Sequence, residues 1–298
     1  MRHFACAVIL SLCGIYRVSA QELKSPSNAE MQAAADHGDA TAQYQLARAY
    51  LRGEGVPKDP KRAFDLMKAA ADQGNPDAIG GLGYFYSVGL VVPRDKNVAI
   101  EWFRKGAEKG SAKAQLNLGN LLLNLGDTAD KTISNRKEGV DWIQRAADQN
   151  LPEAALAYGS ILYFGDHGVE KNYDLSAKYS KFAAEAGFPD AQNLLGNLYD
   201  YGWGVPADVA MAKHWFRKAA FQGNTKAQSN LGRLMGLTSD VNDVRIEAIA
   251  WLLIASDQGE VTAQKELKDH LVGLKDGDMN AASTLAAQLQ VQIHKRSN

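Results

Sequence analysis

One stretch of the sequence has the composition of a phosphate-binding loop. Residues 53–74 read GEGVPKDPKRAFDLMKAAADQG, in which two glycines stand just ahead of a run with helical periodicity. A glycine-rich turn at a helix start can cradle phosphate with its backbone N–H groups, but such loops follow a strand and occur once. Here related turns recur at Gly89, Gly165 and Gly202, and they follow helix-like runs. The pattern therefore predicts a turn between two helices, where glycine adopts positive φ at little cost.

Histidine and cysteine are the other residue types that could do chemistry. Both cysteines lie in the first twenty residues. The histidines after residue 20 form no H-x-x-x-H or HExxH zinc pattern (His37, His167, His214, His270 and His294). No G-x-S-x-G nucleophile turn is present, and the carboxylates are scattered. We therefore expect no catalytic residue, no metal and no cofactor. The net charge of −1 argues against a nucleic-acid partner.

The glycine turns belong to an internal repeat, which must position any functional residue. The spacing predicts six units, over 39–74, 75–110, 111–150, 151–187, 188–223 and 224–259. Each unit contains two runs of helical periodicity, so we expect a pair of helices in each. The second helix should begin after an Asp or Asn N-cap, at Asp59, Asp95, Asn135, Asn172 and Asp208. One pair of helices cannot bury its apolar face alone, so neighbouring pairs must stack.

Two further columns of the repeat predict how the helices pack. Small residues recur where two helices of one unit should approach closely, at Ala47, Gly83, Gly119, Gly159 and Gly196. Glutamines recur in another column, at Gln43, Gln115, Gln192, Gln228 and Gln264. Because the glutamines follow the repeat, we expect them to hold helices together and not to contact a ligand.

The segments AQYQLARAYLRGEGVPKDPKRAFDLMKAAADQG and AQNLLGNLYDYGWGVPADVAMAKHWFRKAAFQG resemble Sel-1-like repeats, which are relatives of the tetratricopeptide repeat. The resemblance covers about residues 39–259 and a half repeat after them. It implies an all-α fold, an α/α superhelical solenoid of about six helix-turn-helix repeats with terminal cap helices. Bacterial members of this family are often exported, and they act as adaptors or regulators of envelope signalling, secretion, motility or host contact.

The two ends of the chain differ from the repeats. Residues 1–20 combine a basic start, an apolar run from Phe4 to Ile15 and small residues before Gln21, which is typical of a cleavable signal peptide. We therefore expect a periplasmic or secreted protein with no stable membrane anchor after cleavage. Residues 21–38 should cap the first repeat, and residues 260–298 should form a half repeat and a helix that covers the end of the core.

The resemblance implies that the first helices of the repeats line a concave groove. A polar column on these helices varies while the packing columns do not, which is typical of either a contact surface or a solvated face. Tyr and Arg are common at interfaces, and Asn can donate to and accept from a peptide backbone. The predicted partner-binding residues are Arg48, Tyr84, Asn117, Asn120, Asn124, Asn193, Asn197, Tyr201, Asn230 and Arg233. A longer loop over 124–136 and the aromatic Trp203 are further candidate contacts.

These observations favour a non-catalytic scaffold or regulator in the bacterial cell envelope that binds a peptide or protein partner in the groove. A secreted factor that contacts host proteins is the first alternative, since a signal peptide specifies only exit from the cytoplasm. An enzyme acting on cell-wall or β-lactam substrates is the second. Some cysteine-rich members of the family are linked to β-lactam binding, but the mature chain lacks their paired cysteines.

Overall fold

The computed structural model describes residues 28–124, 132–237, 242–271 and 274–297. In these ranges the chain forms fifteen α-helices and no strand. The helices are α1 (Asn28–Asp36), α2 (Ala40–Arg52), α3 (Pro60–Asp72), α4 (Pro76–Val88), α5 (Lys96–Glu108), α6 (Ala112–Leu123), α7 (Thr132–Asp148), α8 (Pro152–Phe164), α9 (Tyr173–Glu185), α10 (Pro189–Tyr201), α11 (Val209–Ala220), α12 (Thr225–Leu237), α13 (Asn242–Asp257), α14 (Val261–Leu271) and α15 (Asp276–Ser297). The expected signal peptide lies outside the described residues.

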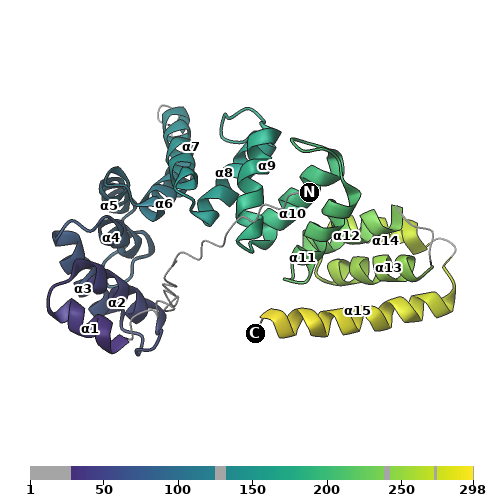
Figure 1. The fold of residues 1–298 in the computed structure, drawn as a ribbon, viewed down its shortest axis with the longest axis horizontal. Coiled ribbons are helices and arrows are strands. Elements are labelled where there is room, and N and C mark those ends of the chain that lie inside the picture. Colours follow the sequence, from purple (N-terminus) through teal and green to yellow (C-terminus); the bar gives the residue numbers. More distant parts are fainter. Residues whose placement is uncertain (1–27, 125–131, 238–241, 272–273, 298) are drawn as a thin grey trace, which may run out of the picture.

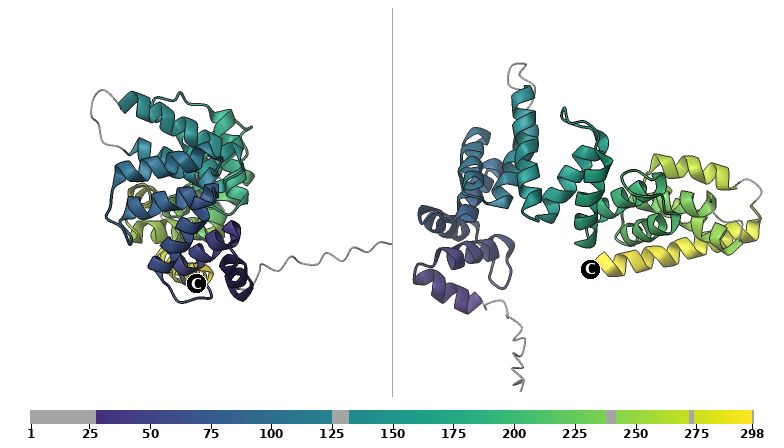
Figure 2. Two further views of the ribbon diagram at one scale, coloured as in Figure 1. Left: turned by 90° about the vertical axis from the view of Figure 1, so that its left-hand side faces the viewer. Right: turned by 45° about the horizontal axis from the view of Figure 1, so that its top comes forward.

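Successive helices pack against one another in pairs, and the pairs stack into a curved solenoid (Figure 1). Along the arch, α4, α6 and α10 lie on the inner side, while α5, α7 and α9 lie on the outer side. Figure 2 shows the same curved stack from two further directions. The predicted all-α solenoid of helical pairs is confirmed. We refer to the first helices of the pairs (α2, α4, α6, α8, α10, α12 and α14) as the inner layer and the second helices as the outer layer.

The GEGV segment is a helix-to-helix turn, as predicted. Gly53 ends α2 with φ of 75° and donates its N–H to the Ala49 carbonyl at 2.8 Å. The chain then returns, and the Asp59 N–H donates to the Tyr50 carbonyl at 3.0 Å while its carboxylate accepts from the Arg62 N–H. The same closure recurs at Asp95, Asn172 and Asp208, which are N-caps as expected.

The N-cap expected at Asn135 is wrong. Helix α7 begins at Thr132, so Asn135 lies within its first turn and does not precede it. The residues inserted in this repeat thus extend a helix, and residues 132–136 of the expected loop are helical. Residues 125–131 of that loop lie outside the described residues.

The small-residue column brings the two helices of a pair together, as predicted. A Cβ added at Gly83 would lie 2.7 Å from the Phe103 ring, and one added at Gly196 would lie 2.5 Å from the Phe216 ring. Real Cβ contacts are essentially never that short, so these positions accept no side chain unless the aromatic ring moves. Phe216 is fully buried, which leaves it little room to move.

The glutamine column links three helices in four repeats, while its last member, Gln264, is exposed on α14. Gln43 of α2 donates to the Ala35 carbonyl of α1 at 3.2 Å, and Gln73 at the end of α3 donates to the Gln43 side chain at 2.8 Å. The same chain of bonds occurs in three further repeats, with pairs Gln115–Gln149, Gln192–Gln222 and Gln228–Gln258. In two repeats both glutamines of the pair are replaced. Repeat two has Ile79 and Lys109 at these positions, and repeat four has Ala155 and Ala186. The paired loss supports the structural role expected of this column.

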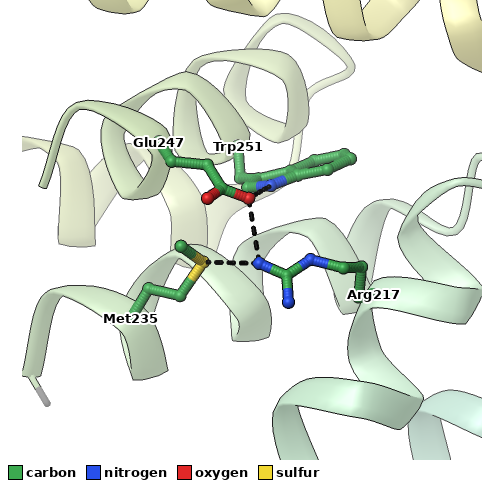
Figure 3. A network of polar contacts seen from close by, with 4 residues as sticks. All are labelled: Arg217, Met235, Glu247 and Trp251. Carbon is green, nitrogen blue, oxygen red and sulfur yellow. Dashed lines mark hydrogen bonds and ion pairs between the residues drawn. The ribbon is translucent and has the colours of Figure 1, made fainter. Parts of the chain in front are cut away.

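A second recurring contact ties neighbouring outer-layer helices. In Figure 3, Arg217 of α11 donates to Glu247 of α13 at 2.9 Å, and Trp251 donates its indole N–H to the same carboxylate oxygen at 3.2 Å. Arg217 also lies 3.7 Å from the sulfur of Met235. The same triad occurs between α5 and α7, where Arg104 and Trp142 both donate to Glu138. Each carboxylate therefore satisfies a tryptophan N–H and bridges two repeats.

The last helix is placed differently from the expected cap. Helix α15 lies along α13, with Leu289 and Ile293 buried in the core that α11, α12 and α13 share. It therefore covers the outer layer of the last repeats and not the end of the stack. The end is formed by α14, in which Ala263 is the buried residue and the outward side chains are mostly polar. A polar outer face allows a terminal repeat to stay solvated.

The close approach at Gly196 predicts that the same substitution has different effects on stability at two glycines. Gly196→Ala should lower the free energy of unfolding by about 1–3 kcal/mol because its Cβ overlaps the Phe216 ring. Gly277→Ala in α15 is the matched control, since nothing lies within 4 Å of its added Cβ. It should be neutral or stabilising by up to about 1 kcal/mol. Urea denaturation followed by circular dichroism measures both, and equal effects would contradict the packing argument.

The Arg–Glu–Trp triads predict a pH-dependent contribution to stability. The hydrogen bond from Arg104 lowers the pKa of Glu138. A lowered carboxyl pKa stabilises the fold above the unfolded pKa, and this contribution is lost as pH falls through the folded value. Glu138→Gln should therefore lower Tm by about 1–3 °C near neutral pH, and the difference should shrink as pH falls below the usual glutamate pKa of about 4.3.

The control for this prediction is Glu185→Gln. Glu185 pairs with Lys181 at 3.9 Å on the surface of α9, with both side chains more than half exposed. An exposed pair of this kind contributes little, so this variant should keep the Tm of the wild type at every pH. A Glu138→Gln difference that stays constant from pH 7 to pH 3 would argue against the ionic contribution.

Candidate functional site

Two hollows of the inner layer are lined by several of the predicted partner-binding residues, a set that we call the predicted stripe. The N-terminal hollow, of about 400 Å³, lies among α2, α4 and α6, with Arg48, Tyr84 and Asn117 in its lining. The C-terminal hollow, of about 580 Å³, lies among α8, α10, α12 and the start of α14. Its lining includes Asn193, Asn197 and Asn230. The structure thus divides the predicted stripe into two chemically different places.

The N-terminal hollow is cationic. Arg48 and Arg52 come from α2, Lys58 from the following turn, and Lys113 from the start of α6. Arg48 lies over the Tyr44 ring with its guanidinium carbon 5.7 Å from the ring centroid. Desolvation and then the charge of Arg48 lower the pKa of Lys113. Cations from two helices therefore repel one another across the hollow.

The floor of the N-terminal hollow is the backbone of α4 at Gly80 and Gly81. The equivalent residues of the next repeat are Leu116 and Asn117, so this repeat lacks both side chains that others carry. Added Cβ atoms would lie 2.6 Å from the Cβ of Ala114 and 2.5 Å from the sulfur of Met67. The glycines therefore let α4 approach the Ala114 and Met67 side chains closely.

The C-terminal hollow is lined by a ladder of asparagines. Asn230 of α12 donates to Asn193 at 3.0 Å and to Asn197 at 3.1 Å, and both acceptors belong to α10. The hydroxyl of the buried Ser229 borders this hollow and has no hydrogen-bond partner in the structure. The ladder orients amide groups of two repeats toward one place, where a polypeptide backbone offers matching donors and acceptors.

Arg233 is an internal tie. Its guanidinium pairs with the Asp200 carboxylate of α10, and the two side chains are 18% and 9% exposed. An arginine held in this way positions α12 on α10. A large loss of binding after its substitution would therefore report on the fold as well as on contact.

The predicted residue Tyr201 belongs to an aromatic cluster at the edge of the C-terminal hollow. Trp203 stacks on Tyr201 at 4.7 Å and on Tyr173 at 4.8 Å between ring centroids. Tyr163 lies beside them, and burial among these rings raises the pKa of Tyr163 to about 12. Tyr201 remains 53% exposed. Trp203 thus folds onto its neighbours from the loop between α10 and α11.

The remaining predicted residues lie between the two hollows. Asn120 is exposed on α6, and Asn124 ends that helix with its side-chain amide donating to the Asn120 carbonyl at 2.7 Å. Asn124 therefore has a local capping contact. Tyr84, which is 44% exposed, and Asn117 are the predicted residues most open at the N-terminal hollow.

Sequence reasoning did not find Lys113, Tyr44 or the glycine pair of α4. Lys113 lies one helical turn before Asn117, so the two side chains share a face of α6. That shared face could have indicated Lys113 as a further contact residue. The glycine pair could have been noticed because a conformationally costly residue occupies two successive positions inside a helix. The charge of the hollow arises only when α2 and α6 are placed on either side of α4.

In the part of the chain that the structure describes, no group of three His, Cys, Asp or Glu residues is placed to hold a metal ion. No helix in those ranges is long and apolar enough to cross a membrane.

The stacked helical pairs define a class of protein, the α-helical repeat solenoids. A family model described as the Sel1 repeat matches six consecutive segments, at 40–75, 76–111, 112–151, 152–188, 189–224 and 225–260. The chain belongs to the Sel1 repeat family. Proteins of this family act in protein–protein interaction, typically as regulators or adaptors.

Two solved structures support the fold. The protective antigen c5321 of uropathogenic Escherichia coli, which has an SLR fold, is 28% identical with a TM-score of 0.75, covering 91% of this chain and 57% of that one. A Sel1 repeat protein from Oxalobacter formigenes is 29% identical with a TM-score of 0.60, covering 78% of this chain and 99% of that one.

The chitin synthase regulator SKT5 of Malassezia restricta is 36% identical over 95 residues, which are 32% of this chain and 7% of the regulator. The matched regions span only 7% to 20% of the first curated relatives.

The Arg233–Asp200 pair predicts which stripe substitutions disturb the fold. Arg233→Ala should lower the free energy of unfolding by about 2–4 kcal/mol because it leaves a largely buried carboxylate unpaired. Asn117→Ala, on an exposed side chain, should change it by no more than about 0.5 kcal/mol. Thermal denaturation of both variants checks this. A harmless Arg233→Ala would show that the pair is not a tie.

Proposed function

We propose that this protein is a non-catalytic scaffold or regulator of the bacterial cell envelope, which binds a peptide or protein partner along its inner layer. The observation that carries the proposal is the pair of hollows on that layer. Each is bordered by polar side chains from three or more helices, while the packing columns beneath are buried. A partner that follows the arch can therefore contact several repeats without disturbing the core.

The chemistry of the two hollows supports an extended polypeptide as the partner. Amide groups of Asn193, Asn197 and Asn230 can hydrogen-bond a backbone without reading its side chains. Tyr84 and the aromatic cluster at Trp203 offer rigid apolar surface at low entropic cost. Such a combination of amide donors and aromatic contacts is suited to recognition and brings together no nucleophile and base.

The envelope location rests on the amino-terminal sequence. Residues 1–20 have the pattern of a signal peptide. The similar proteins c5321 and the Oxalobacter Sel1 repeat protein are both bacterial. Cell fractionation with amino-terminal sequencing tests this part. A mature chain that begins at Gln21 in the periplasm or the medium supports it, and an uncleaved chain in the cytoplasm contradicts it.

Affinity capture from envelope extract tests the binding proposal. Wild-type bait should enrich a partner that is lost with the triple variant Tyr84→Ala, Asn117→Ala, Asn120→Ala, whose side chains are all exposed on the inner layer. The matched control substitutes three exposed outer-layer residues, Lys61→Ala, Lys68→Ala and Glu101→Ala, and should retain the partner. Circular dichroism first establishes that both baits remain helical. Equal recovery with both triple variants would place the binding surface elsewhere.

A further inference from the structure

The two hollows of the inner layer differ in charge. The N-terminal hollow has Arg48, Arg52, Lys58 and Lys113 in its lining, and Asp77 is the one carboxylate among the described residues that line it. The C-terminal hollow has Lys226 in its lining together with Asp190 and Glu260. The lining of the first therefore carries a net charge of +3, and that of the second −1. A partner that lies along the arch meets a positive end and a weakly negative end.

Local contacts offset only part of this positive charge. The Asp77 carboxylate accepts a hydrogen bond from the Ser111 hydroxyl at 2.5 Å, so it is already bound to the start of α6. Arg52 pairs with Glu54 at 3.3 Å, but both side chains are more than half exposed, where an ion pair is weak. An adjoining hollow shares Arg48, Asp77 and Lys113 and adds Lys109 to the set. The cationic surface thus continues past the rim of the first hollow.

Lys113 is the cation of α6 that faces the arginines of α2. Its pKa is lowered by desolvation, and next by the charge of Arg48 on the facing helix. Asp77 and Glu153 act in the opposite direction and do not cancel the effect. An anionic group placed between α2 and α6 would relieve this repulsion, and it would be attracted by both helices at once.

The interior of the N-terminal hollow is apolar, in contrast to its rim. Leu51, Leu90 and Met67 contribute side chains, and the glycine pair of α4 also lines it. The volume of about 400 Å³ is sufficient for one large side chain. An apolar floor beneath a cationic rim selects a ligand that is apolar at one point and acidic on either side of it.

We propose that the N-terminal hollow is the docking site for an acidic segment of the protein partner, which inserts one large apolar side chain beside Leu51, Met67 and Leu90. The carboxylates of that segment pair with Arg48, Arg52 and Lys113. Its polypeptide chain continues toward the asparagine ladder, where contacts are made to the backbone. This inference rests on the proposed function and specifies the chemistry of the partner at one end of the groove.

Fluorescence anisotropy with three synthetic nonapeptides tests the proposal on purified protein. The first peptide has a central leucine flanked by aspartates and glutamates, the second replaces leucine with serine, and the third replaces the acids with lysines. The leucine peptide should bind about tenfold or more tightly than the serine peptide, and the lysine peptide should not bind. Affinity for the acidic peptides should fall as salt is raised from about 0.05 M to about 0.5 M.

A pair of charge-matched variants localises the binding. Arg48→Gln with Lys113→Gln should weaken binding of the leucine peptide about tenfold or more. Lys61→Gln with Lys68→Gln on α3 removes the same charge from the exposed outer layer and should bind as the wild type does. Equal weakening by both double variants would show attraction to overall charge only and would overturn the site.

The other outcomes are also decisive. Equal affinity for the leucine and serine peptides would overturn the apolar part of the site, and binding of the lysine peptide would overturn its charge preference. A partner recovered by affinity capture through the inner layer, combined with no preference for the acidic peptide, would keep the proposed function and reject this inference. Preferential peptide binding without any captured protein would retain the site and reject the scaffold role.

Discussion

The structure depends on the close approach of the two helices in each repeat. A position without a side chain on the first helix admits an aromatic or aliphatic residue from the second, as Gly83 admits Phe103 and Gly196 admits Phe216. These contacts are buried, so the pair becomes one rigid unit with an apolar side on each flank. The next pair must cover that flank, and the solenoid follows from repeating this step.

Polar contacts add specificity to this packing. The glutamine chains fix the angle at which the first helix meets the second helices before and after it. The Arg–Glu–Trp triads tie the outer layer between two pairs of repeats. Because each of these side chains satisfies another, they leave few unpaired polar groups beneath the surface. Many inner-layer side chains are then free to vary, although Arg233 and Asp200 still tie α12 to α10.

That freedom explains why the inner layer can carry two kinds of chemistry. At one end, cations of α2 and α6 surround a hollow that the glycine pair of α4 also lines. At the other end, amides of α10 and α12 join into a ladder. Both hollows are formed by equivalent positions of the repeat, so their different chemistry comes from the different residues that each repeat places there. A curved stack of similar units thus presents a surface that changes along its length.

The limits of the sequence-based predictions have physical reasons. Local features were predicted well, because N-caps, turn glycines and helical periodicity act within one repeat. The prediction of an N-cap at Asn135 was wrong because the inserted residues extended α7 by about one turn. Alignment of the repeats gives the position of a cap but does not show whether inserted residues continue the helix. The sequence did not show that two of the predicted contacts, Arg233 and Asn230, bond to Asp200, Asn193 and Asn197 about one repeat away. One sequence column cannot show whether its members bond to one another.

The sequence by itself determined the helical pairs, their number, the turns between them and the family, because these follow from spacing and from residue types that act over a few positions. The tertiary structure decided how α15 lies along α13 and how the predicted stripe divides into two hollows. It also decided which charges oppose one another. Those properties depend on the angles between successive helical pairs. Small packing differences accumulate along the stack, so no single repeat encodes the resulting arrangement.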